Sequence, residues 1–180
     1  MLLTWIAGAS GFLRAWDRRP PPFALLLAGV LIVSFTLAFS RAGHHLATYA
    51  PLWTLVAVQS FRLPLELAMH AMYERGIMPQ QMTYTGRNLD IVSGATAVIV
   101  AALVAAGYAG RNLVAAWNAL GFALLLNIIV VAVLSTPVFS YFGPEHLNTF
   151  VTYVPFVWLP AVMVSAALAG HIVIARALAR

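Results

Sequence analysis

The chain has 180 residues, of which 62% are hydrophobic and only 8% are charged, whereas soluble domains carry roughly 25% charged residues. The net charge of +5 comes from arginines that form no dense run and do not alternate with aromatic residues, which excludes the usual nucleic-acid modules. The absence of cysteine excludes disulfides and thiolate metal sites. The composition predicts an all-α integral membrane helical bundle embedded in a lipid bilayer.

The N-terminal region is apolar but short. Only about 13 residues precede Arg14, and a helix needs ~20 apolar residues to cross the hydrocarbon core. We therefore expect a short interfacial helix, or one docked on the bundle. The stiff segment Pro20–Pro22 follows it. This pattern predicts residues 1–22 as an N-terminal interfacial segment and linker, and residues 23–180 as a single transmembrane domain.

Five later stretches are long and apolar enough to predict about five transmembrane helices. Their connections are short, so neighbours in sequence are expected to be antiparallel neighbours in space. The predicted spans are Phe23–Ser40, about Tyr49–Tyr73, about Leu89–Tyr108, Leu113–Ser135 and about Phe150–Ile174.

The arginines give a weak indication of orientation. We call the side of the membrane that holds the N-terminus side A, and the opposite side B. Loops on side A carry Arg14, Arg18, Arg19, Arg75 and Arg87; loops on side B carry Arg41, Arg111, Arg176 and Arg180. Because cytoplasmic loops hold the excess of basic residues and the earliest charges often dominate, we expect a cytoplasmic N-terminus.

The second predicted span carries the most informative pattern of polar residues. At 100° per residue, Gln59, Arg62, Glu66, His70 and Tyr73 fall on one face of the helix. An arginine near the centre of a span costs ~2.5–3.5 kcal/mol on insertion scales, and Glu66 one turn away is the expected partner. The stripe predicts either an intramembrane binding site or an Arg–Glu pair that locks the bundle's register.

Other predicted spans supply residues that could converge on this stripe. Asp90, in the first turn of the third span, is expected near its Glu66 end; the alternative is an acid satisfied by backbone donors. In the fourth span, Asn127 is the better candidate to face the stripe, and Asn118 is expected to hydrogen-bond between helices. His171 lies towards side B without a supporting carboxylate, so no metal site is predicted.

Three functional hypotheses remain open, and the sequence assigns no cofactor. The first is binding or transport of a small polar ligand or proton at the stripe and Asp90. The second is a membrane-embedded enzyme acting on a lipid or isoprenoid, with Glu66 or Asp90 as base, His70 as acid–base partner and Arg62 as headgroup clamp. The third is a structural or assembly subunit, alone as a homo-oligomer or with another membrane protein.

Three blocks of sequence resemble a family of small bacterial multi-pass membrane proteins of unassigned function. They are Phe61–Glu66, Met82–Ile91, and Phe156–Pro160 with His171 downstream. The resemblance covers roughly residues 45–178, and this chain has Leu89 where family members often have phenylalanine. It implies a location in the bacterial inner membrane and supplies no activity.

Overall fold

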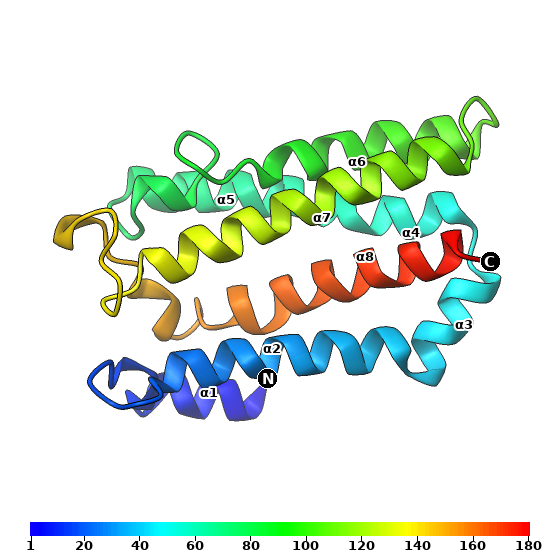
Figure 1. The fold of residues 1–180 in the computed structure, drawn as a ribbon. Coiled ribbons are helices and arrows are strands. Elements are labelled where there is room, and N and C mark those ends of the chain that lie inside the picture. The colour runs from blue at the N-terminus through cyan, green and yellow to red at the C-terminus, as the bar shows by residue number, and fades with distance from the viewer.

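A computed structural model describes residues 1–180, which form helices and connections without any strand. The longer helices run along one common axis (Figure 1). The α-helices are α1 Leu2–Ala9, α2 Pro22–Phe39, α3 Arg41–Tyr49, α4 Leu52–Val58, α5 Arg62–Glu74, α6 Asp90–Ala105, α7 Arg111–Leu134 and α8 Ser165–Leu178. Short 3-10 turns are η1 Phe12–Arg14, η2 Gln59–Phe61, η3 Gln80–Met82, η4 Pro144–His146 and η5 Phe150–Thr152, and η6 Leu159–Val164 is π-helical.

Three helical segments are long and apolar enough to cross a membrane: α2, α7, and η6 with α8 over residues 159–178. The distribution of side chains agrees with a lipid environment. On α2, for example, Ile32 is 67% exposed while Ser34 is fully buried and donates its hydroxyl to the Val30 carbonyl at 2.6 Å. Apolar surface outside and polar groups inside are what lipid solvation favours. The chain is therefore a membrane protein with three such helices.

The second predicted span is a helix with an interruption. α4, η2 and α5 follow one another directly over residues 52–74, and the 3-10 turn sits just before Arg62. The residue Pro64 has no N–H to offer the preceding turn, which favours a local departure from α-helical hydrogen bonding here. The third predicted span, α6, is apolar but only 16 residues long.

The last predicted span begins later than expected. Residues 150–158 form the 3-10 turn η5 and further turns rather than a membrane helix, and the helical segment starts at Leu159. Two prolines explain the shift, because neither Pro155 nor Pro160 can donate to a preceding turn. The expected span at Phe150–Ile174 is thus corrected to residues 159–178.

The packing order differs in part from the chain order. The helix α6 packs against α4, α5 and α7, as short connections predict. By contrast, α2 packs chiefly on α8, so the first and last long helices are neighbours, as Figure 1 also shows. The bundle is closed by this contact between the two ends of the chain.

Helix α1 is docked on the bundle. A Cβ added at Gly8 would lie 3.1 Å from Cγ2 of Val154 and 3.4 Å from the Thr152 carbonyl, so the helix packs closely on this turn region. In the view of Figure 1, α1 lies below the first part of α2, with its axis along that of α2 and its chain running in the opposite direction. Docking on the bundle is one of the two expected placements of this segment.

One glycine sets how closely α5 and α6 approach. A Cβ at Gly94 of α6 would collide with the backbone nitrogen of Leu63 and lie 2.9 Å from the carbonyl carbon of Arg62. Small residues at such positions let membrane helices approach closely. Gly94 therefore brings the backbone of α6 against the start of α5, where Arg62 sits.

We predict that Gly94→Ala lowers the thermal unfolding temperature of the purified protein, because the added methyl group overpacks a backbone contact by about 1–3 kcal/mol. The control is Gly29→Ala in α2, where nothing lies within 4 Å of the added Cβ. That variant should be neutral or stabilised by about 0.5–1 kcal/mol through helix propensity. Equal unfolding temperatures for the two variants would contradict the close α5–α6 contact.

Candidate functional site

Arg62 is buried inside the bundle, and all of its hydrogen-bond donors have acceptors. Arg62 is 1% exposed; its Nε donates to Oδ2 of Asp90 at 2.6 Å and its Nη2 pairs with Oδ1 of the same carboxylate. Nη1 donates to Oγ of Ser93 at 2.8 Å and lies 2.7 Å from Nε2 of His171, and Nη2 also donates to the Gly121 carbonyl at 3.4 Å. A guanidinium has five N–H donors, and each of them has an acceptor here.

The histidine in this cluster is held in one tautomer. Since Arg62 has only donors, Nε2 of His171 accepts, and the ring proton lies on Nδ1. Nδ1 donates to Oδ1 of Asn118 at 2.8 Å, and Nδ2 of Asn118 donates to the His171 carbonyl at 3.2 Å. His171 is thus a neutral acceptor between α7 and α8. No group of three or more metal-ligating side chains exists in the structure, and His171 is committed to Arg62.

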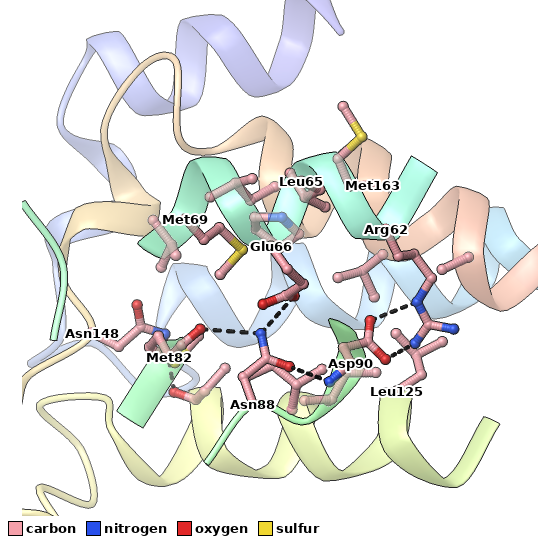
Figure 2. A pocket seen from close by; sticks show the side chains of 18 of the residues that line it. Arg62, Leu65, Glu66, Met69, Met82, Asn88, Asp90, Leu125, Asn148 and Met163 are labelled. Carbon is pink, nitrogen blue, oxygen red and sulfur yellow. Dashed lines mark hydrogen bonds and ion pairs between the residues drawn. The ribbon is translucent and has the colours of Figure 1, made fainter. Parts of the chain in front are cut away.

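The expected Arg62–Glu66 hydrogen bond is absent from the site. Glu66, 2% exposed, instead accepts at Oε1 from Nδ2 of Asn88 at 2.7 Å. Asn88 also donates to the Met82 carbonyl at 3.1 Å and accepts from the backbone N–H of Asp90 at 3.1 Å (Figure 2). A single asparagine therefore contacts both the Glu66 carboxylate and the backbone of Asp90.

The second oxygen of Glu66 has no partner. Oε2 is buried and without a hydrogen bond, and Figure 2 shows only one of the two carboxyl oxygens joined to a neighbour. A buried acceptor of this kind is expected to have a partner, because leaving it unmade costs about 1–3 kcal/mol and more for a charged group. Glu66 is the polar group of the cluster that the protein leaves unsatisfied.

Glu66 lines a cavity of about 90 Å³. Of the 22 residues that line it, 16 are hydrophobic. The polar ones are Arg62, Glu66, Asn88, Asp90 and Asn148, and of these Asn148 also leaves a buried acceptor, Oδ1, without a partner. The cavity thus combines apolar walls with two unsatisfied acceptors.

A groove on the outside of the bundle adjoins this cavity. It has a volume of about 420 Å³ and is lined by Phe61, Pro64, Leu65, Met163 and Ala166. Phe61, Leu65 and Met163 also line the cavity, so the same three side chains separate the two spaces. The groove lies between α5 and the η6–α8 segment, on the side that would face lipid.

The predicted site residues divide into three groups. Arg62, Glu66 and Asp90 line one cavity. Gln59 is fully buried but donates to the Ala167 carbonyl at 3.3 Å and does not line the cavity. The Asn127 side chain is exposed and donates to the Arg87 carbonyl at 2.7 Å, away from the stripe.

His70 and Tyr73 form a separate cluster near side A. The His70 ring lies 4.5 Å from that of Tyr84 and 5.9 Å from that of Tyr73, and its Nε2 is 3.7 Å from Oε1 of Glu74. Neither His70 nor Tyr73 lines the cavity. Glu66 and His70 share a helix face, but they do not share a site.

Sequence reasoning missed His171 as a member of the Arg62 cluster. One signal was available for His171: a buried guanidinium needs more acceptors than one carboxylate offers, and His171 is the histidine within the last apolar stretch. The sequence indicates Asn88, just before the third predicted span, and Asn148, in the loop Ser140–Asn148, as residues that could cover the site, with a solvated loop as the alternative. The structure places both in the lining of the cavity.

Comparison with known protein families, with curated proteins and with solved structures finds no match. The site therefore has to be interpreted from its own geometry.

We predict that Arg62→Met and Asp90→Asn each destabilise the protein by about 3–5 kcal/mol, because each leaves a buried charge without its partner. The double variant should lose much less than the sum of the single losses. Denaturant unfolding of the purified protein in mixed micelles measures all four forms. Additive losses would contradict direct coupling between the two side chains.

Proposed function

We propose that this protein binds a small, largely apolar molecule inside the membrane, with Glu66 as the polar anchor. The observation that carries this proposal is the unpartnered Oε2 of Glu66 beside a cavity with mostly hydrophobic walls. Ligand sites typically combine apolar walls with a few well-placed polar groups. The expectation of a small polar ligand is narrowed accordingly to a molecule with an apolar body and a single polar group.

Arg62 and Glu66 are expected to have different roles, the first in positioning neighbouring groups and the second in contacting the ligand. Arg62 has no free N–H donor, so it is a poor clamp for an incoming headgroup and a good positioning group for Asp90 and the surrounding helices. Glu66 is held on one oxygen by Asn88 and is free on the other. A carboxylate fixed in this way can receive a ligand without first breaking an ion pair.

We further propose five membrane crossings in a bacterial inner membrane, with the N-terminus in the cytoplasm. The interrupted helix over residues 52–74 and the 16-residue α6 would provide the two crossings beyond the three long apolar helices. Both run along the common axis of the bundle (Figure 1). The arginine distribution and the family resemblance support the orientation and the compartment.

A membrane-embedded enzyme is the second candidate, and the lateral groove favours it. A lipid-soluble substrate could pass from the groove past Leu65 and Met163 to Glu66. The expected acid–base pair of Glu66 with His70 is not assembled, however, and Arg62 has no donor left for a headgroup. The same groove serves equally well as the entry route of a ligand that is bound but not converted.

A structural role as an assembly subunit draws its support from the saturated Arg62 cluster, which joins α5, α6, α7 and α8. It does not explain the cavity beside that cluster. A purely structural cluster requires neither a cavity nor a carboxylate without a partner, so we rank the structural role below ligand binding. Assembly as a homo-oligomer or with a partner subunit is compatible with both roles.

We predict that filling the cavity expels the bound molecule. Ala132→Leu adds a branched side chain to the cavity lining and leaves the Glu66 residue itself unchanged. The control, Ala123→Leu, makes the same change at an exposed position of the same helix. Native mass spectrometry of gently extracted protein should show a small-molecule adduct on the wild type and on Ala123→Leu, and none on Ala132→Leu. A wild type without an adduct, or an adduct retained by Ala132→Leu, counts against the proposal.

The proposed topology predicts which introduced cysteines a membrane-impermeant thiol reagent can reach in intact cells. The natural chain has no cysteine, so single variants carry the only thiol. Asp17→Cys, Gln80→Cys and Glu145→Cys lie on side A and should stay unlabelled until the cells are opened. His45→Cys and Tyr108→Cys lie on side B and should be labelled from outside. Labelling of both groups from the same side would overturn the count of five crossings.

A further inference from the structure

The charges around the cavity do not balance. Arg62 and Asp90 form a buried ion pair that is neutral as a unit. Glu66 is the only other ionisable side chain that lines the cavity, so in its ionised form the site carries one uncompensated negative charge. An isolated carboxylate in apolar surroundings is very costly, and it either takes up a proton or binds a cation. When Glu66 is ionised, one further positive charge is needed to make the site neutral.

No other titratable group facing Glu66 can supply that charge. Along its own helix the facing group is Arg62, and from α6 it is Asp90. The linings contributed by α2, α7 and the η6–α8 segment are apolar, and Asn148 adds only a neutral amide. His70 packs against Tyr84 outside the cavity. The missing positive charge has to come from solvent or from a ligand.

The hydrogen-bonding pattern indicates the kind of cation. The two unsatisfied atoms that line the cavity, Oε2 of Glu66 and Oδ1 of Asn148, are both acceptors. They complement a donor such as an ammonium N–H and repel a carboxylate or a phosphate. The apolar walls favour a hydrocarbon body. At about 30 Å³ per water-sized group, the cavity of about 90 Å³ holds the ammonium end and about two methylene groups, and a longer chain extends towards the lateral groove.

We propose that Glu66 is a single-occupancy site that holds either a proton or the ammonium group of a small lipophilic amine, and exchanges one for the other. This inference rests on the proposed ligand-binding function and names the ligand class. In the exchange the ammonium ion R–NH₃⁺ enters, the Glu66 carboxylic acid gives its proton to water, and the ammonium carboxylate pair remains. No bond to carbon changes, and charge is conserved at every step.

The exchange gives the protein a means of coupling. One carboxylate cannot bind both ions at once, so proton and amine compete for the same oxygen. The lateral groove beside Phe61, Leu65 and Met163 provides a lipid-side route for the amine, while the proton can arrive through the polar residues around Asn88. A gradient of either ion across the membrane could then drive the other in the opposite direction.

The test uses the purified chain of 180 residues in lipid nanodiscs and three probes of nearly equal size: n-hexylammonium, 1-hexanol and hexanoate. Calorimetry in buffers of different ionisation enthalpy measures affinity and proton release between pH 5 and pH 9. We expect n-hexylammonium to bind most tightly and to release close to one proton per molecule at the acidic end. Its affinity should rise about tenfold per pH unit there and level off at higher pH.

Two matched variants separate the role of Glu66 from a general effect of charge. Glu66→Gln keeps the Oε1 acceptor for Asn88, so it should fold, but its ammonium affinity should fall at least tenfold and lose its pH dependence. Glu74→Gln makes the same change at an exposed carboxyl on the same helix and should bind like the wild type. The pH profile of the wild type is a test that needs no variant.

The outcomes distinguish this inference from the function on which it rests. If 1-hexanol binds as tightly as n-hexylammonium without pH dependence, the cavity is a ligand site but the exchange is wrong. If hexanoate binds best, the assigned charge is wrong. If no probe binds and Ala132→Leu also leaves the native adduct unchanged, the proposed function fails together with the inference.

Discussion

The Arg62–Asp90 ion pair is the interaction on which the rest of the bundle depends. An arginine inside a membrane helix is tolerated only when its charge and all its donors are satisfied. Meeting that demand requires groups from α6, α7 and α8 at defined heights along the bundle. The pair therefore fixes the register of four helices at once.

The small residues around the pair follow from the same demand. Gly94 lets α6 approach the backbone of α5, and a Cβ at Gly121 would lie only 2.7 Å from both Cε1 of His171 and Oγ of Ser93. The short side chains of Asp90 and Ser93 can then hydrogen-bond to the Arg62 guanidinium, which would be out of their reach if α5 and α6 lay further apart. Close packing at these glycines therefore allows the hydrogen bonds of Arg62 as well as van der Waals contact between the helices.

Every donor of Arg62 has an acceptor, whereas Glu66 keeps one oxygen without a partner. The two carboxylates have different partners, because Glu66 accepts from Asn88, whereas the Asp90 carboxylate accepts from Arg62. Asp90 is neutralised by Arg62, whereas Glu66 faces the cavity with an unshared oxygen. Two chemically similar side chains thus have different environments, since one is held in an ion pair and the other keeps a free acceptor beside the cavity.

The sequence predicts the inward face of the second span well. Helical periodicity brings Arg62 and Glu66 to the interior, and the first-turn position of Asp90 brings it near them, since both statements depend only on local geometry. The partner of Arg62 was assigned wrongly because an intrahelical neighbour one turn away had to be weighed against an interhelical one. That choice depends on how far apart the helices lie, which Gly94 determines.

The position of His171 illustrates a second limit of prediction from sequence, namely the placement of helix ends. In a span beginning at Phe150, His171 would lie close to side B. Because the helical segment begins at Leu159, His171 is only twelve residues along it, and its Nε2 reaches Nη1 of Arg62. The starting residue depends on how the two prolines and the turn at residues 150–158 pack, and local sequence signals place helix ends poorly.

The sequence separation of the Arg62 partners sets the order in which they become available during synthesis. Asp90 follows Arg62 by 28 residues and His171 follows it by 109. At roughly 5–20 residues per second of synthesis, Asp90 is made within about 1–6 s, but His171 only after about 5–22 s. The Arg62–Asp90 pair can therefore form before its other acceptors exist, and the Gly121 carbonyl of α7 and Nε2 of His171 in α8 join it later. The contact of α2 with α8 likewise waits for the last of these helices, so the innermost polar cluster and the closure of the bundle are completed by the same element.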